Sequence, residues 1–228
     1  MKPEIGELKS LALFQAVRGE TLEELAGCSK VIPLNKTEQL FSEKDKMIYA
    51  YIVLTGNLTV YRYTEFGQKR VIYLLSQGEL VNEIIFDFNH ASINCEAFDR
   101  SRVLAIERVR LLQLMERDFA LTAAFMNAMG KKIRRLYWQI KNTIPLKIEK
   151  KVAAKLWKLC KDYGVEAQEG TLIDLDITAG YLADMLGSSR ETVSRALTEL
   201  ENLELILRQN RRIIVVDRSR LAGYFKSL

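Results

Sequence analysis

The residues best suited to contacting another molecule lie close together near the end of the chain. Four polar side chains recur at helical spacing and share one arc of a helix that turns ~100° per residue: Arg190, Glu191, Ser194 and Arg195. Arginine can bond bidentately to guanine O6 and N7, and glutamate can accept from the cytosine amino group. A merely solvated face usually carries scattered lysine and glutamate, so this compact face predicts a helix that reads base edges in DNA.

Two helices and a tight turn are predicted to position these side chains. Thr178 is a good N-cap for a first helix, and Ser188 and Ser189 can cap a second helix over residues 190–202. Gly187 supplies the positive φ that the turn between them needs. The second helix N-terminus and the Ser189 hydroxyl also suit a phosphate. An apolar stripe would bury the other side of this helix: Val193, Ala196, Leu197 and Leu200.

The flanking segments predict a winged helix-turn-helix over residues 146–228. Residues 147–163 have helical spacing, and two β-branched runs at 205–207 and 213–216 flank a turn at 209–210. Contacts to the DNA backbone position a protein without specifying sequence. The wing residues expected to make such contacts are Arg208, Arg211 and Arg212.

The charge distribution agrees with a polyanion binding to the second half of the chain. Residues 1–109 hold 13 basic and 15 acidic side chains, whereas residues 110–228 hold 21 basic and 14 acidic ones. Double-stranded DNA is therefore expected to bind the second half.

A dimerisation segment is expected over residues 110–145, with a long heptad-patterned helix from Asp118 to about Ile144. Asp118 can cap it, and Pro145 disfavours helix at the residue before it. Two sets of residues seven apart, offset by three, predict a parallel two-helix dimer interface. The alternative is a helix packed on its own domain. The predicted interface comprises Phe119, Met126, Met129, Ile133, Leu136 and Ile140; the opposite, basic side carries Lys131, Lys132, Arg134, Arg135 and Lys141.

Short strands broken by turns are expected within residues 1–109. Residues 51–54 and 58–61 flank Gly56-Asn57, and residues 61–63 and 71–74 flank a polar turn containing Gly67. Such β-branched and aromatic runs predict antiparallel hairpins in a small barrel or roll. Residues 8–25 precede them with helical spacing. The expected fold class is α+β, with an N-terminal antiparallel β-roll, a dimerisation helix and a C-terminal winged helix-turn-helix.

Several function classes are disfavoured by composition. No apolar run reaches the ~18 residues of a membrane span, and the N-terminus has no signal-peptide core, so we expect a cytoplasmic protein with no membrane partner. Three dispersed cysteines show no C-x-x-C spacing, so no metal site is expected. G-x-S-x-G, P-loop and H-E-x-x-H motifs are missing. We therefore expect no catalytic residues and no enzyme.

The run from Ser189 to Leu197, S-R-E-T-V-S-R-A-L, resembles the recognition helix of the CRP/FNR transcription regulators. The resemblance covers nearly the whole chain and implies a cyclic-nucleotide-binding-like jelly roll before the dimer helix. In cAMP-receptor-like members, the positions of Arg190, Glu191 and Arg195 read a TGTGA-type half-site. In FNR-like members, those of Glu191, Ser194 and Arg195 read a TTGAT-type one. This chain holds both sets, and we favour a TGTGA-like half-site.

The same resemblance places an effector site in the β-roll. Family members that bind cyclic nucleotides use Gly-Glu and Arg-Ser pairs, where this chain has Asn82-Glu83 and Ala91-Ser92. No arginine occurs in residues 71–99, so a buried cyclic phosphate would lack its main charge partner. The effector-contact candidates carried over are Asn82, Glu83, Ser92, Leu136 and Tyr137.

Other cofactors of the family fit this sequence poorly. An FNR-type iron–sulfur cluster needs four cysteines, including an N-terminal group, and this chain has three dispersed ones. His90, the single histidine, is more typical of a surface loop residue than of a haem ligand. Two alternatives for the effector remain: an unidentified small molecule between the roll and the dimer helix, or no ligand at all.

The resemblance also implies a mechanism and partners. A homodimer would bind a palindromic operator, with a hinge at residues 143–145 setting the spacing of its recognition helices. RNA polymerase would contact residues 161–171. The rival interpretation is a ligand- or redox-sensing module with a degenerate helix-turn-helix; the intact Arg190, Glu191 and Arg195 speak against it.

Overall fold

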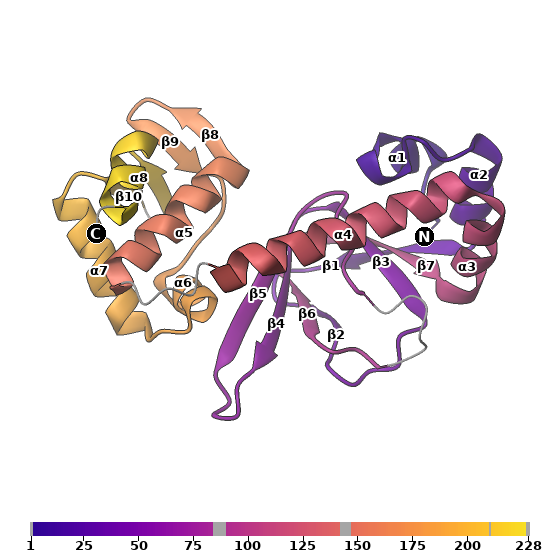
Figure 1. Ribbon diagram of the computed structural model, residues 1–228, viewed down its shortest axis with the longest axis horizontal. Coiled ribbons are helices and arrows are strands. Elements are labelled where there is room, and N and C mark those ends of the chain that lie inside the picture. The colour runs from indigo at the N-terminus through magenta and orange to yellow at the C-terminus, as the bar shows by residue number, and fades with distance from the viewer. Residues whose placement is uncertain (1, 84–89, 142–146, 210, 227–228) are drawn as a thin grey trace. The chain divides into compact units, whose positions relative to one another are not determined.

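The computed structural model describes residues 2–83, 90–141, 147–209 and 211–226. The chain divides into two compact units, one formed by Met1–Arg62 with Val71–Thr143 and the other by Tyr63–Arg70 with Ile144–Leu228. The first unit holds an antiparallel β-roll and a long helix, and the second holds a winged helix-turn-helix (Figure 1). The predicted fold class is therefore confirmed.

Two sheets form the roll, in the strand orders β1-β7-β3 and β2-β6-β4-β5. Burial alternates along outer strands such as β1, while the central β7 is buried at most positions, as expected for strands with one or both faces covered. The strands are β1 (Ser29–Leu34), β2 (Gln39–Phe41), β3 (Tyr49–Thr55), β4 (Leu58–Tyr63), β5 (Lys69–Leu75), β6 (Asn94–Ala97) and β7 (Ser101–Glu107).

One predicted hairpin is correct and the other is wrong. Strands β4 and β5 are neighbours around the turn at Gly67, as predicted. Strands β3 and β4 lie in different sheets, because β3 pairs with β7 and β4 pairs with β6. Gly56 is the corner between the sheets: its φ is 77°, and a Cβ there would lie 2.6 Å from the Arg100 carbonyl oxygen.

Helices from both ends of the first unit cover one side of the roll. Leu8, Leu25, Leu111 and Phe125 are fully buried in one apolar cluster that also includes Leu104 of β7. A separate helix, α3, occupies the start of the range predicted as one dimerisation helix. The helices are α1 (Ile5–Ser10), the 3₁₀ turn η1 (Ala12–Phe14), α2 (Gly19–Gly27), α3 (Arg108–Arg117) and α4 (Phe119–Lys141).

Asp118 fixes the start of α4. Its carboxylate accepts from the Ala120 backbone N–H at 2.9 Å and from the Arg18 backbone N–H at 3.2 Å. Burial alone would raise the pKa of Asp118, but these bonds and one from Thr21 outweigh it and hold the pKa below its usual value. The predicted cap is therefore present, and it also ties α4 to the N-terminal helices.

We expect Asp118→Ala to lower the free energy of unfolding at pH 7 by about 2–3 kcal/mol, because a cap is lost and buried N–H groups lose their acceptor. A lowered pKa gives stability that is present above the unfolded-state value of ~3.9 and is lost as pH falls through the folded value. Asp118→Asn should therefore flatten the acid side of the stability profile in urea titrations. Glu116→Ala, at an exposed neighbour, should leave both quantities unchanged; an equal loss there would contradict the assignment.

The second unit encloses its own core. Its sheet has the order β10-β11-β9-β8, and α5 packs against α7 and α8. The predicted wing is confirmed as β10 and β11, with position 210 outside the described residues, whereas the β8–β9 hairpin was not predicted from the sequence. The elements are α5 (Ile148–Tyr163), β8 (Gly164–Ala167), β9 (Gly170–Ile173), α6 (Ala179–Leu186), α7 (Arg190–Asn202), β10 (Ile206–Gln209), β11 (Arg212–Val215) and α8 (Arg218–Lys226).

In the described part of the chain, no helix combines the length and the apolar character needed to cross a membrane.

Candidate functional site

The helix-turn-helix is built by the local signals that the sequence carries. The Thr178 hydroxyl accepts from the Tyr181 N–H at 3.1 Å and caps α6. Gly187 has φ 62° and ψ 49°, the left-handed conformation that ends this helix. The Ser189 hydroxyl accepts from the Thr192 N–H at 3.2 Å and caps α7. The predicted cap at Thr178, the turn at Gly187 and the bounds of the second helix are thus confirmed as local structure, and of the two candidate caps of that helix Ser189 is the one used.

Helix α7 presents one polar face and buries the other. The predicted apolar stripe is buried in full: Val193, Ala196, Leu197 and Leu200. On the opposite arc, Arg190, Glu191 and Arg195 are exposed and Ser194 is partly exposed. Burial of the stripe fixes the helix rotation, so the polar set is brought together on the surface at the N-terminal end of the helix.

Glu191 lies where the N-terminal dipole of α7 favours a negative charge. Hydrogen bonds from its own backbone N–H and the Ser189 hydroxyl lower the pKa of Glu191, and Arg190 and Arg195 lower it further. The carboxylate is therefore ionised at neutral pH and can act only as an acceptor. This is the form needed to accept from a cytosine amino group.

The wing arginines differ in how far they are already engaged. Arg208 Nε donates to Glu201 at 2.8 Å, which ties the wing to α7. Arg212 forms ion pairs with Asp174 at 3.3 Å and with Asp176 at 3.8 Å. Arg211 is exposed. Of the three predicted backbone contacts, Arg211 is the most readily available to a phosphate, and Arg208 has an internal role that the sequence did not predict.

In the first unit, three of the predicted effector residues are engaged with the roll itself. Both polar atoms of the buried Asn82 side-chain amide bond to β3. Its Oδ1 accepts from the Tyr51 N–H and its Nδ2 donates to the Tyr49 carbonyl, each at 2.9 Å. Ser92 donates to the Glu83 carboxylate. The structure brings Glu83 and Ser92 together, while Asn82 has a structural part.

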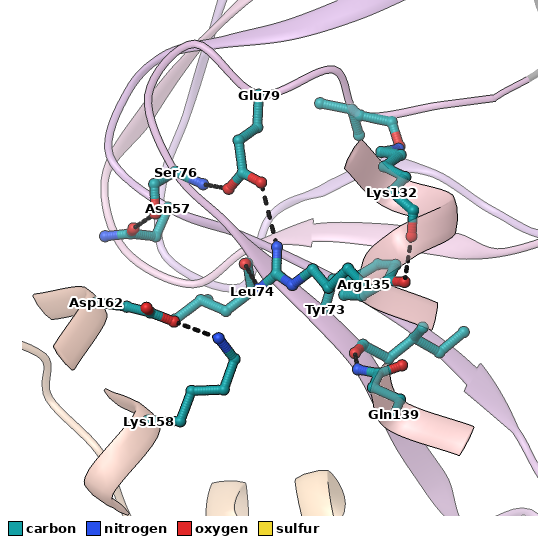
Figure 2. Close-up of polar contacts among 12 residues, drawn as sticks. Asn57, Tyr73, Leu74, Ser76, Glu79, Lys132, Arg135, Gln139, Lys158 and Asp162 are labelled. Carbon is teal, nitrogen blue, oxygen red and sulfur yellow. Dashed lines mark hydrogen bonds and ion pairs between the residues drawn. The ribbon is translucent and has the colours of Figure 1, made fainter. Parts of the chain in front are cut away.

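The side chains by which α4 contacts the roll differ from the two effector-contact candidates on this helix, whose role stays a prediction. Leu136 and Tyr137 are exposed. Lys132, Arg135 and Gln139 instead extend onto β5 and the segment after it (Figure 2). Two residues of the predicted basic side, Lys132 and Arg135, therefore contact the roll, because the heptad pattern alone does not show which flank of the helix meets it.

The predicted heptad seam forms an exposed apolar stripe on α4. Phe119 is 78% exposed, Met126 62% and Ile133 47%. Met129 is partly buried and packs against the core cluster. The side chain of Ile140 and the predicted hinge at residues 143–145 lie outside the described residues.

The cysteines lack the features of redox sensors. Cys95 and Cys160 are buried, and Cys28 is partly buried. Burial raises the pKa of all three thiols. A reactive sensor cysteine needs the opposite shift, toward thiolate at neutral pH. These surroundings weigh against the redox-sensing alternative.

Two family models match consecutive parts of the chain. A cyclic nucleotide-binding domain matches residues 31–118, and a Crp-like helix-turn-helix domain matches residues 150–224. The first covers the roll through α3, and the second covers α5 into α8.

Individual relatives are similar along most of the chain. A CRP-like cAMP-activated global transcriptional regulator of Mycobacterium tuberculosis is 20% identical over 216 residues, which is 94% of this chain and 96% of that protein. FixK2 of Bradyrhizobium japonicum has a TM-score of 0.74 at 20% identity, with coverage of 86% of this chain and 96% of that one. The c-di-GMP responsive regulator CLP of Xanthomonas campestris has a TM-score of 0.76 at 18% identity, with coverage of 88% and 100%.

Proposed function

The chain belongs to the CRP/FNR family of transcription regulators, and from this premise we propose that it binds palindromic DNA with TGTGA-like half-sites as a homodimer. The observation that carries the proposal is the exposed set Arg190, Glu191 and Arg195 at the capped end of α7. Arginine suits the guanines of such a half-site, and the ionised glutamate suits a cytosine on the complementary strand. Ser194 would contact the DNA at the same face. The phosphate contacts that position the protein would come from Thr178, Ser189, Arg211 and Arg212.

The exposed stripe of α4 supports the dimer. Large apolar side chains such as Phe119 and Met126 stay exposed on the single chain, and a parallel pair of α4 helices would cover them. The two recognition helices would then contact half-sites ~34–36 Å apart. RNA polymerase would contact the surface formed by residues 161–171, which end α5 and form the β8–β9 hairpin.

The proposal extends to control through the β-roll by an effector other than cAMP. A relative of this chain is described as cAMP-activated and another as responsive to c-di-GMP, so family membership does not fix the effector. Ala91 replaces the arginine expected beside Ser92. A cyclic phosphate there would meet the Glu83 carboxylate without an arginine to balance it.

Fluorescence anisotropy on a labelled TGTGA palindrome, at one fixed salt concentration, tests both parts. We expect binding that scrambled DNA cannot match and that added cAMP does not change. Equal affinity for the palindrome and for scrambled DNA under both conditions would overturn the half-site assignment. Specific binding only with cAMP would instead overturn the effector assignment and leave the half-site intact.

A further inference from the structure

One face of α4 changes from apolar to polar along the helix. Leu121 and Phe125 are fully buried in the core cluster. The same face continues, at alternating spacings of four and three residues, into side chains that form hydrogen bonds. The complete stripe is Leu121, Phe125, Ala128, Lys132, Arg135 and Gln139.

The polar half of this stripe holds α4 on the roll through main-chain carbonyl groups (Figure 2). Tyr73 completes the contact, because its hydroxyl donates to the Lys132 carbonyl at 3.3 Å and its ring lies 4.6 Å from the Arg135 guanidinium. We call Lys132, Arg135 and Gln139 the α4 latch. Its bonds are Lys132 Nζ to Val81 O at 2.8 Å, Arg135 Nη2 to Leu74 O at 3.2 Å and Gln139 Nε2 to Ile72 O at 2.9 Å.

Lys132 brings a positive charge close to Glu83, one of the predicted effector-contact residues, and to Glu79. Its burial lowers the pKa of Lys132 to about 8, while the Glu83 and Glu79 carboxylates act in the opposite direction. The ammonium form therefore still predominates at pH 7. Glu79 also accepts from Arg135 at 3.1 Å, so one carboxylate of the roll is paired with Arg135 and also acts electrostatically on Lys132.

We propose that Lys132 is a built-in ligand of the β-roll, whose ammonium group holds α4 in place and so supports basal operator binding, on which an effector other than cAMP would act. The Lys132 ammonium meets the Val81 carbonyl oxygen and the negative charges of Glu79 and Glu83, and such surroundings suit a cation and repel an anion. The chain itself supplies that cation. This inference rests on the proposed function for its DNA readout.

Packing of α4 against the roll does not by itself require a lysine at position 132. The first half of the stripe is anchored by apolar side chains, whereas a partly buried ammonium loses hydration when it binds. Lys131 and Arg134, its neighbours on the helix, are exposed. A charged contact that can open is suited to holding a helix in one of two states.

Lys132→Ala and n-propylammonium chloride test the proposal, since that ion matches the atoms removed beyond Cβ. The rate of hydrogen–deuterium exchange at the backbone amides of residues 133–139 measures, without DNA, how firmly the α4 latch holds the helix. We expect faster exchange in the variant and a return toward the wild-type rate with propylammonium, but not with equal tetramethylammonium. Lys131→Ala should exchange as the wild type does. Equal exchange in Lys132→Ala and wild type, or equal effects of the two ions, would overturn the proposal.

Anisotropy on the palindrome gives the functional readout. We expect wild-type protein to bind without added ligand, Lys132→Ala to bind roughly tenfold or more weakly, and propylammonium to restore binding. Lys132→Met keeps the stem and should lose binding while unfolding at or above the wild-type temperature. Undiminished binding by both variants would overturn the built-in ligand. Wild-type protein that does not distinguish the palindrome from scrambled DNA would instead overturn the proposed function, with the exchange result still deciding the latch.

Discussion

Glu191→Ala is expected to weaken binding to a TGTGA palindrome by at least ~30-fold and to relax selectivity at one base pair of each half-site. A lost base contact costs ~1–3 kcal/mol. A dimer loses the contact twice, so the lower bound is about 2 kcal/mol, or ~30-fold in dissociation constant. Glu191 is suited to this test because it is ionised, exposed and outside the buried stripe of α7. Competition by palindromes carrying each symmetric single-base change measures both effects.

Arg211→Ala is the control for Glu191→Ala, because it removes a predicted phosphate contact from the same unit. Arg211 is exposed in the wing, and the loss of a phosphate contact should weaken binding about equally on every sequence while reducing the salt dependence. Thermal unfolding of both variants checks that the unit stays folded. A Glu191→Ala variant that lost affinity equally on all sequences would place Glu191 at the phosphates rather than at a base.

The helix-turn-helix could be predicted almost completely from sequence because its determinants are local. Thr178 and Ser189 bond to N–H groups three residues away, and Gly187 adopts its conformation within a single turn. Short-range bonds of this kind are fixed by neighbouring residue types, independently of the rest of the fold. The polar face of α7 then follows from helical periodicity.

Strand pairing in the roll could not be predicted in the same way. Residues on either side of Gly56 have the composition of a hairpin, yet Tyr51 pairs with Ala105 and Val60 pairs with Cys95. These partners are distant in sequence, and β-propensity does not select among them. The β8–β9 hairpin before α6 was not predicted because its four-residue strands lack a strong apolar pattern.

On helix α4, the side chains that contact the roll could not be predicted from the heptad pattern. A second stripe, running from Leu121 through Phe125 to Lys132 and Gln139, was present in the sequence. It was missed because its second half is polar, and polar residues beside a heptad seam usually face solvent. Hydrogen bonds to carbonyl groups of the roll reverse that preference for Lys132. Periodicity read without regard to polarity would have found the stripe.

Ile133→Glu is expected to convert the dimer to monomers and to weaken palindrome binding by at least ~100-fold. Ile133 lies on the exposed stripe of α4, and in a parallel pair each such position meets its own copy. Two facing carboxylates would lose hydration and repel each other, which costs several kcal/mol. Separated recognition units would lose the ~10²–10⁴-fold gain of linked binding, while binding to a single half-site should remain.

Asn127→Glu is the control, because it adds the same charge at an exposed position of α4 outside the predicted seam. Sedimentation velocity at micromolar concentration measures the oligomeric state, and circular dichroism checks that each variant is folded. We expect Asn127→Glu to remain dimeric and to bind the palindrome as the wild type does. A folded Ile133→Glu variant that stayed dimeric would mean that another surface joins the two copies. In that case the exposed stripe of α4 would need a different partner, and the spacing of the half-sites could no longer be derived from a pair of α4 helices.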